Sequence, residues 1–414
     1  MKPLDISKMA ANPPTRMGVA QLTRLAFEGK DLGEIWNRLI ETVRRQPANA
    51  APVMDLSVLA QLMGDQKAGA ALQQGALQVQ RLYRSQTAIG SLRITVLALA
   101  GVSDIGANIP LEFLLSGSDV ELITLYVSPE ASLPNPLPAH DVAIVALGYA
   151  DGMVDTLEQI EEIAGRWPRP LLNPPDRIFK LQRDEFYALA NGLPGIRIPK
   201  TVRVSRQTLS QIGNSNIAPD CLLPGARFPL IVRPVDSHAG RGLEKLDTVD
   251  AIAAYLDQTI EAEFFLSPFV DYRDGDGLYR KYRVVFIDGK SFACHMAIAP
   301  EWKVWYLNAG MDQSEDKRAE EAHFFATFDE NFAVRHAAAF EALMRTVGLD
   351  YFGIDCAETA EGELLLFEGE TAMIVHDMDP PDVYPYKPAQ MRKVFSAFTA
   401  MLHRHAQSDR AQAA

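Results

Sequence analysis

The chain has 414 residues, of which 48% are hydrophobic and 22% charged, a composition typical of a globular protein of two or three domains. Its formal net charge of -13 disfavours nonspecific binding to nucleic acid or to an anionic membrane surface. No run of roughly 18 apolar residues is present, so we expect no membrane-spanning segment. Together with the net charge, this predicts neither a nucleic-acid nor a membrane partner.

Cysteine usage and the N-terminal sequence indicate the cellular compartment. Cys221, Cys294 and Cys356 are far apart and odd in number, which predicts neither a disulfide framework nor a metal site. The N-terminus lacks the apolar core of a signal peptide. These features predict a protein of the reducing cytoplasm.

Residues 1–90 are predicted to form a helical N-terminal region. Apolar residues recur at helical spacing in four segments between Gly18 and Arg84. Gly29 and Gly64 fall at similar points of successive helix pairs, which loosely resembles a tetratricopeptide array, but two units are too few to be diagnostic. We favour a small helical bundle, with a peptide-binding or dimerising repeat as the alternative.

Residues 91–175 predict an open, parallel α/β sheet. Strands are expected at 92–100, 120–127, 141–147 and 170–173, and helices at 109–115 and 154–164. Ligands bind at the carboxyl ends of the strands in such sheets, so the loop with Ser103, Asp104 and Asn108 is a candidate substrate loop. Alternatively, Asn108 merely caps a helix.

A short buried strand and a loop with two glycines follow. The strand at 229–234 carries Arg233, and the loop contains Gly240 and Gly242, whose backbone N–H groups can approach phosphate oxygens. Because the spacing matches neither a Walker loop nor a dinucleotide fingerprint, the loop alone is weak evidence. The apolar segment 264–270 is suited to lining an adenine slot.

The residues from 281 to 295 predict a β-hairpin that turns at Asp288 and Gly289. Alternation along its first strand places Lys281 and Arg283 on one face. Further helices are expected at 179–193, 250–255, 333–346 and 389–405.

The stretch Tyr351–Glu370 predicts two strands with residues 361–362 as their loop. That register sets Asp355 opposite Glu368, and alternation of side chains adds Glu370 to the same face. Opposed carboxylates repel each other, and a divalent cation such as Mg²⁺ removes this cost by taking oxygen ligands. The alternative is a solvated acidic hairpin.

Together these motifs resemble the ATP-grasp ligases, and among them the glutathione synthetases and ribosomal-protein glutamate ligases. The resemblance covers about residues 92–405. It implies an α/β and α+β protein, in which an open α/β domain precedes two α+β lobes that hold ATP between antiparallel sheets. The resulting domains are 1–90 (helical extension), 91–175, 176–270 and 271–406, followed by a polar tail at 407–414.

The site residues come from the same resemblance. It implies that Asp355, Glu368 and Glu370 bind two Mg²⁺ ions, with Mn²⁺ as an alternative. The implied catalytic residues are Arg283, Asn308 and Arg233. The implied ATP-binding residues are Lys180, Arg233, Ser237, His238, Gly240, Gly242, Ser267, Phe269, Val270 and Lys281. The implied substrate residues are Asn108, His376 and Asp377, the last two of which can instead form only a polar loop.

Four positions depart from the family pattern. Arg233 replaces a lysine, Lys281 stands where an acid is common, Ser267 or Pro268 replaces a hinge acid, and Glu370 replaces an asparagine. Arginine keeps the positive charge and can clamp a phosphate with two donors. The extra acid at Glu370 strengthens cation binding and can change the preferred metal.

The resemblance implies a reaction and its partners. A substrate carboxylate attacks the γ-phosphate of ATP, and an amine or thiol captures the acyl phosphate, which yields ADP, phosphate and, with an amine, an amide. We expect small carboxylate and amine substrates, a peptide among the options, and a homo-oligomer. The alternatives are a non-catalytic nucleotide sensor or scaffold whose N-terminal helices bind a partner, and a phosphotransferase of similar fold. The sequence identifies neither substrate.

Overall fold

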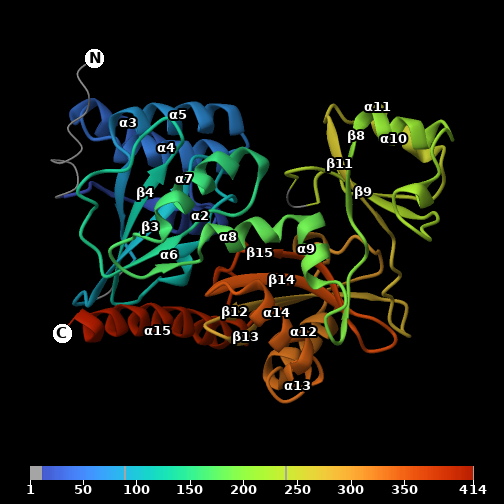
Figure 1. Cartoon of the computed structure of the whole chain (residues 1–414). Coiled ribbons are helices and arrows are strands. Elements are labelled where there is room, and N and C mark those ends of the chain that lie inside the picture. The colour runs from blue at the N-terminus through green and yellow to red at the C-terminus, as the bar shows by residue number, and fades with distance from the viewer. Residues whose placement is uncertain (1–11, 88–89, 238–239, 414) are drawn as a thin grey trace. The chain divides into compact units, whose positions relative to one another are not determined.

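The structure is a computed structural model that describes residues 12–413 except 88–89 and 238–239. The described chain is a mixed α/β protein with three sheets, in agreement with the predicted fold class (Figure 1). It divides into two compact units. Unit 1 contains the described parts of Met1–Ile178, Leu349–Phe352 and Glu370–Ala414, and unit 2 contains Phe179–Gly348 and Gly353–Gly369. None of the described helices combines the length and apolar character needed to cross a membrane.

A six-stranded sheet with the order β1-β2-β4-β3-β5-β6 forms the centre of unit 1. Its strands are β1 (Thr15–Arg16), β2 (Leu82–Ser85), β3 (Ile94–Gly101), β4 (Val120–Val127), β5 (Val142–Val145) and β6 (Leu171–Leu172). β3 pairs in parallel with β4 and β5, and β5 pairs in parallel with β6, which confirms the predicted parallel sheet. β3 and β4 are buried almost throughout, as is usual for parallel strands that are covered on both faces.

The N-terminal helices belong to this unit. The helices of unit 1 are α2 (Gly18–Phe27), α3 (Leu32–Arg45), α4 (Ala51–Leu62), α5 (Gln66–Val79), α6 (Leu111–Leu114), the 3-10 helix η1 (Asp151–Met153), α7 (Val154–Ala164), α8 (Pro175–Ile178) and α15 (Lys387–Ala413). α4 is buried over most of its length among its helical neighbours. The bundle lies on the sheet face formed by Tyr83, Ala100 and Tyr126. Since β1 and β2 also join this sheet, residue 90 is not a boundary between two units.

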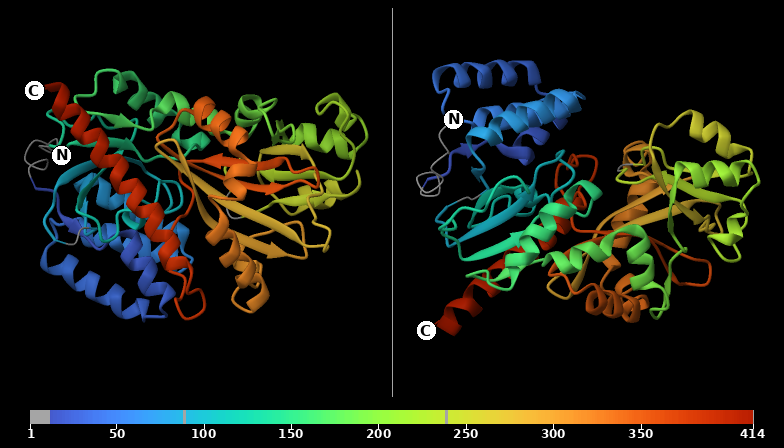
Figure 2. Two further views of the ribbon diagram at one scale, coloured as in Figure 1. Left: turned by 90° about the horizontal axis from the view of Figure 1, so that it is seen from below. Right: turned by 45° about the horizontal axis from the view of Figure 1, so that its top comes forward.

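The last helix also belongs to unit 1, although the sequence assigned it to the lobe at 271–406. α15 packs on β3, β5 and α6, and Figure 2 shows it lying across the strands of this unit. The rings of Tyr351 and Phe398 meet edge to face at 5.2 Å. Helix α15 continues through residues 407–413 of the predicted tail, and Asp409 pairs with Arg169 at 2.8 Å.

Unit 2 contains two sheets. The first is antiparallel with the order β10-β9-β11-β8, and its elements are β8 (Val202–Ser205), α10 (Arg206–Gly213), the 3-10 helix η3 (Pro219–Cys221), β9 (Leu230–Pro234), β10 (Glu244–Leu246), α11 (Ala251–Asp257) and β11 (Glu263–Pro268). Its apolar core includes Leu209, Ile252 and Phe264. These residues hold α10 and α11 against the sheet.

The second sheet of unit 2 has the order β13-β12-β14-β15-β7. Its strands are β7 (Ile196–Arg197), β12 (Tyr279–Ile287), β13 (Lys290–Ala299), β14 (Tyr351–Glu358) and β15 (Leu364–Glu370). The accompanying helices are η2 (Phe179–Leu181), α9 (Arg183–Ala190), η4 (Tyr306–Asn308), α12 (Glu315–Thr327), α13 (Phe332–Arg335) and α14 (Ala337–Val347). Helix α12 was not predicted, because its first turns are charged and carry no apolar stripe.

The turn between β14 and β15 differs from the predicted one by one residue. Thr359 N donates to Glu363 O at 3.0 Å, and Gly362 N donates to Thr359 O at 2.9 Å. The loop therefore has three residues, with Gly362 in the left-handed region at φ 82.

A buried polar network joins the N-terminal helices to the sheet. Arg16 donates to Glu112 Oε1 at 2.8 Å, and Asp55 accepts backbone N–H bonds from Met17 at 2.9 Å and Gly18 at 3.0 Å. Burial raises the pKa of Asp55 from 3.8 to about 6, which its hydrogen bonds and Arg16 only partly oppose. The folded protein therefore binds a proton at Asp55 more readily than the unfolded chain does.

We predict that this site makes unit 1 more stable in weak acid. The contribution of Asp55 is fully present below pH 4 and is lost as the pH rises through about 6, which corresponds to roughly 3 kcal/mol. Denaturant unfolding of wild type and Asp55→Asn from pH 4.5 to 8 measures the effect. The stability advantage of wild type over the variant should shrink with rising pH. Asp155→Asn, at an exposed position of α7, is the control, and a constant difference between wild type and Asp55→Asn would contradict the prediction.

Candidate functional site

Two carboxylates and four basic side chains form one cluster in unit 2, which we call the carboxylate cluster. Asp355 lies on β14 and Glu368 lies on the neighbouring strand β15. The basic residues are Lys281 and Arg283 of β12, Arg233 of β9 and Arg183 of α9. The cluster thus joins both sheets of unit 2 to helix α9.

Asp355 is fully buried, with an exposed fraction of 0%. Arg283 grips its carboxylate with two bonds, Nε to Oδ1 at 2.7 Å and Nη2 to Oδ2 at 2.9 Å, and Lys281 Nζ lies 2.6 Å from Oδ2. These bonds confirm that Lys281 and Arg283 share one strand face. Burial alone would raise the pKa of Asp355, but Arg283 and Lys281 hold it well below its usual value. Asp355 is therefore ionised at neutral pH.

Glu368 is held by a residue that the sequence interpretation missed. Arg183 Nη2 forms an ion pair with Glu368 Oε2, and Arg183 Nη1 donates to Phe367 O at 3.2 Å. A side chain at Gly369 would meet the ring of Phe186 at 2.7 Å, so its glycine lets α9 pack directly on β15. The sequence did contain a feature that could have identified Arg183 as a site residue. Arg183 follows Lys180 by three residues and so lies on the same face of the predicted helix.

The two carboxylates are electrostatically linked, and the basic residues keep both ionised. Burial would raise the pKa of Glu368, yet Arg183 lowers it, against a smaller opposing effect from Asp355. Arg233 Nη1 lies 3.7 Å from Glu368 Oε2. Among the named members of the cluster, four basic side chains exceed two carboxylates by two positive charges, within a protein of net charge -13. Such an excess favours binding of a polyanion.

The carboxylates fit a hard divalent cation only in part. Ionised carboxylate oxygens suit Mg²⁺, but both oxygens of Asp355 already accept bonds from Arg283 and Lys281. Within residues 12–413, apart from the two undescribed gaps, no three His, Cys, Asp or Glu side chains form a group that could hold a metal ion. Glu370 belongs to unit 1, where its Oε1 would lie 3.3 Å from a Cβ placed on Gly148. The three-carboxylate metal site remains a prediction.

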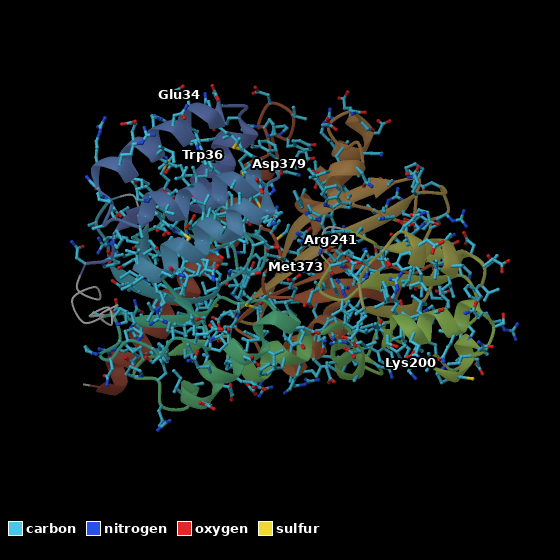
Figure 3. All side chains as sticks on the ribbon, turned by 90° about the horizontal axis from the view of Figure 1, so that it is seen from above. Glu34, Trp36, Lys200, Arg241, Met373 and Asp379 are labelled. Carbon is cyan, nitrogen blue, oxygen red and sulfur yellow. The ribbon has the colours of Figure 1, made fainter. Side chains whose placement is uncertain are left out.

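The first residues of the loop after β9 bind the side chain of Arg233 through Ser237. Arg233 Nε donates to Ser237 Oγ at 3.2 Å, a second guanidinium nitrogen donates to Ser237 O, and Ser237 Oγ donates to Pro234 O at 2.8 Å. Gly240 and Gly242 both have positive φ, and a Cβ on Gly242 would lie 2.7 Å from Pro234 Cδ. Figure 3 labels Arg241 between them. His238 lies outside the described residues.

The predicted adenine segment lies beside the strand of Arg233. Ser267 pairs with Ile231, and Phe269 N donates to Pro229 O at 3.1 Å. The ring of Phe269 also contacts Trp302 at 5.8 Å, and Lys245 Nζ lies 5.0 Å from its centre. Val270 is half-buried. The segment therefore continues from the strand that pairs with the strand of Arg233, and Lys245 stands over the ring of Phe269.

Two further predicted residues lie in short helices. Lys180 is half-buried in η2, and its side chain makes no hydrogen bond or ion pair with another described residue. Asn308 is exposed in η4, where its Oδ1 accepts from Trp305 N at 2.9 Å and its amide nitrogen donates to Lys303 O at 3.5 Å. The structure thus gives Asn308 a local capping contact, and its catalytic role remains a prediction.

The predicted substrate residues belong to unit 1. Asn108 exchanges hydrogen bonds with both backbone groups of Gly101, at 2.8 Å and 3.2 Å, and so ties its loop to the end of β3 instead of capping a helix. Asp377 forms an ion pair with Arg24, and the ring of His376 lies 6.1 Å from that of Phe113. Their roles toward a substrate remain predictions.

Comparison with solved structures finds similarity to ATP-grasp ligases. A RimK domain ATP-grasp protein from Sphaerobacter thermophilus is 12% identical with a TM-score of 0.42, over 74% of this chain and 99% of that one. D-alanine–D-alanine ligase from Bacillus anthracis, complexed with ATP, is 12% identical with a TM-score of 0.44, over 77% and 99%. Carboxyaminoimidazole ribonucleotide synthase from Aspergillus clavatus, complexed with ATP, is 13% identical with a TM-score of 0.36, over 62% and 60%.

No protein-family profile matches the chain, and no curated protein matches it. The similar solved structures share 12–13% of their residues with this chain, at TM-scores below 0.5. Function has to be inferred from the side chains of the site.

We predict that removing Arg283 destabilises unit 2 through the buried charge it leaves behind. Arg283→Met should cost about 3–5 kcal/mol at neutral pH, because Asp355 would keep only Lys281 as a close partner. The cost should fall as the pH drops, since a protonated Asp355 needs no counter-charge. Chemical denaturation from pH 4.5 to 8 measures this.

The matched control is Arg335→Met. Arg335 pairs at 2.9 Å with Glu358, which lies on β14 like Asp355. The Arg335 side chain is half-exposed, so the expected cost in stability is about 0–1 kcal/mol. Equal costs for the two variants would show that the Asp355 pair is not the buried, charge-balanced contact described above.

Proposed function

We propose that the protein is an ATP-dependent ligase that activates a substrate carboxylate as an acyl phosphate and transfers the acyl group to an amine. The observation that supports this most strongly is the carboxylate cluster. Cations from two strands and one helix of unit 2 converge on two ionised carboxylates, and within this cluster the basic residues outnumber the acids. A polyphosphate ester is a substrate whose charge suits that excess.

The proposed chemistry needs no covalent nucleophile from the protein. An oxygen of the substrate carboxylate attacks the γ-phosphorus of ATP, and the bond to the bridging oxygen breaks, so that ADP leaves with the electron pair. The amine then attacks the acyl carbon, inorganic phosphate leaves, and the nitrogen loses a proton. Such a reaction depends on positioning and on charge neutralisation.

The basic residues have separate proposed roles. Arg283 and Lys281 neutralise charge that develops on the transferred phosphoryl group, while Arg233 and Lys180 hold the remaining phosphates. The loop with Gly240 and Gly242 adds backbone N–H donors. The adenine lies against the segment from Ser267 to Val270, which adjoins the strand of Arg233.

Asp355 and Glu368 are the residues that would hold Mg²⁺, which supplies charge neutralisation on the phosphates when it is bound. Their ionised state supports this assignment, because carboxylates must be deprotonated to act as ligands. Lys281 has to leave Asp355 Oδ2 if a metal ion takes that oxygen. We include Glu370 as a third ligand on the resemblance alone.

The position of Lys281 also supports a second candidate function. A basic side chain 2.6 Å from a metal-ligand carboxylate competes with a metal ion for it. A protein with such a site can bind a nucleotide without turning it over and serve as a sensor or scaffold. We favour the ligase, which we place in the cytoplasm as a homo-oligomer acting on small carboxylate and amine substrates.

The test is an ADP-release screen in which the purified protein, ATP and Mg²⁺ are combined with pairs of amino acids and small carboxylic acids. Wild type should release ADP with at least one pair and form a new amide, which mass spectrometry detects. Asp355→Ala and Glu368→Ala should lower the rate at least about 100-fold, because each removes a carboxylate that would hold the Mg²⁺ neutralising the phosphates. The matched control is Glu358→Ala, an acid on the same strand as Asp355 that pairs with Arg335 and should remain nearly as active.

Full turnover by Asp355→Ala would refute the metal assignment. ATP binding measured by calorimetry, without ADP release in any mixture, would favour the sensor. A stable phosphorylated product without a new amide would indicate a phosphotransferase.

A further inference from the structure

A second polar cluster lies in unit 1, at the carboxyl edge of the parallel sheet. β3 ends at Gly101 and β5 ends at Val145, and the loops that follow them are joined. Asn108 and Leu147 form an isolated bridge, and Gly148 N donates to Ala107 O at 2.9 Å. Ligands of open α/β sheets bind at this edge. The loops are therefore in the position where a substrate site is expected.

A segment from the C-terminal part of the chain is fixed to the same edge. Thr371 is fully buried, and its hydroxyl donates to Leu147 O at 2.9 Å. A Cβ on Gly148 would lie 2.9 Å from the Cβ of Ala372, so only glycine permits this close approach. Figure 3 labels Met373 and Asp379 in the segment that continues from here to α15. The same segment continues into His376, whose ring lies near Phe113 of α6, and Asp377.

Helix α2 contributes a basic side chain to this segment. Arg24 forms an ion pair with Asp377, and its guanidinium carbon lies 5.4 Å above the centre of the buried Phe113 ring. The same ring lies 6.1 Å from that of His376. This cation–π contact holds the guanidinium group against the Phe113 ring. The exposed fraction is 30% for the Arg24 side chain and 31% for the Asp377 side chain, so a solute can reach the pair.

We propose that Arg24 and Asp377 form an amino-acid binding site, in which Arg24 binds the carboxylate and Asp377 binds the ammonium group of the ligand. This inference rests on the proposed function, to which it adds the class of acceptor substrate. The sequence resemblance had suggested Asp377 alone, while Arg24 lies in the N-terminal region that the resemblance does not cover. The N-terminal helices thereby obtain a role in substrate selection.

The charge balance of the pair selects for a zwitterion. A ligand with a carboxylate and an ammonium group replaces one ion pair by two, and leaves neither Arg24 nor Asp377 without a counter-charge. A ligand with only one of these groups pairs with one of the two side chains and leaves the other without a counter-charge. Leaving a partly buried charge unpaired costs free energy of binding. The planar fork of arginine also matches a carboxylate with two parallel bonds. Amino acids should therefore bind better than their amides or N-acetyl derivatives.

Calorimetry on the full chain without nucleotide tests the site with the twenty amino acids, and then with the amide and N-acetyl derivative of each one that binds. Wild type should bind at least one amino acid and bind both derivatives at least about tenfold more weakly. Arg24→Gln should weaken binding of the amino acid about tenfold or more and should no longer distinguish it from its amide. Arg24→Lys should restore part of the affinity, since it keeps the charge. Arg44→Gln, which removes an exposed arginine of α3, is the matched control.

A charge swap separates ligand binding from a structural role. In Arg24→Asp with Asp377→Arg, an ion pair can form again, so a purely structural role predicts full amino-acid affinity. The proposed site predicts weaker binding, because the stacked cation over Phe113 is lost and the two ligand-binding groups have exchanged places.

The inference is overturned if no amino acid binds to wild type, if Arg24→Gln binds as tightly as wild type, or if the swap restores affinity fully. These outcomes are independent of ADP release, whose failure in the earlier screen would refute the ligase while leaving an amino-acid binding site in place.

Discussion

The ion pairs around Asp355 are the contacts on which the structure of the candidate site depends. Removing a carboxylate from water costs several kcal/mol, and Asp355 is fully buried. Only a geometry that presents Arg283 and Lys281 to both of its oxygens offsets this cost. The position of β12 beside β14 is therefore coupled to the charge state of one residue. The same requirement extends to Glu368, which brings Arg183 from α9 and Arg233 from β9 into the cluster.

The cluster gives an acidic protein a local excess of positive charge. A net charge of -13 repels polyanions at long range, but long-range effects are screened in salt, whereas buried pairs are screened far less. The basic residues are already held in place before a ligand binds, by bonds to carboxylates and to backbone oxygens. An anion that enters therefore meets oriented donors, which is the arrangement that electrostatic catalysis uses.

The N-terminal helices are part of unit 1 rather than an attachment to it. β1 and β2 extend the six-stranded sheet, and the buried pair of Arg16 and Glu112 connects them to α6. The same helices supply Arg24 to the carboxyl edge of the sheet. A region with no counterpart in the sequence resemblance is thereby joined both to the core and to the candidate acceptor site.

Local sequence pattern determined much of the fold, including the bounds of β4 and α7 and the common face of Lys281 and Arg283, because hydrophobic periodicity and side-chain alternation act over a few residues. The turn at Gly362 was misjudged by one residue, since a two-residue and a three-residue loop have nearly the same sequence signal. Other contacts join residues that are far apart in the sequence. Arg183 and Glu368 are 185 positions apart, and Arg24 and Asp377 are 353 positions apart. Helix α15 packs on elements of unit 1 that most of the chain separates from it. Only the tertiary structure decided these contacts, because burial and charge compensation depend on which distant elements meet.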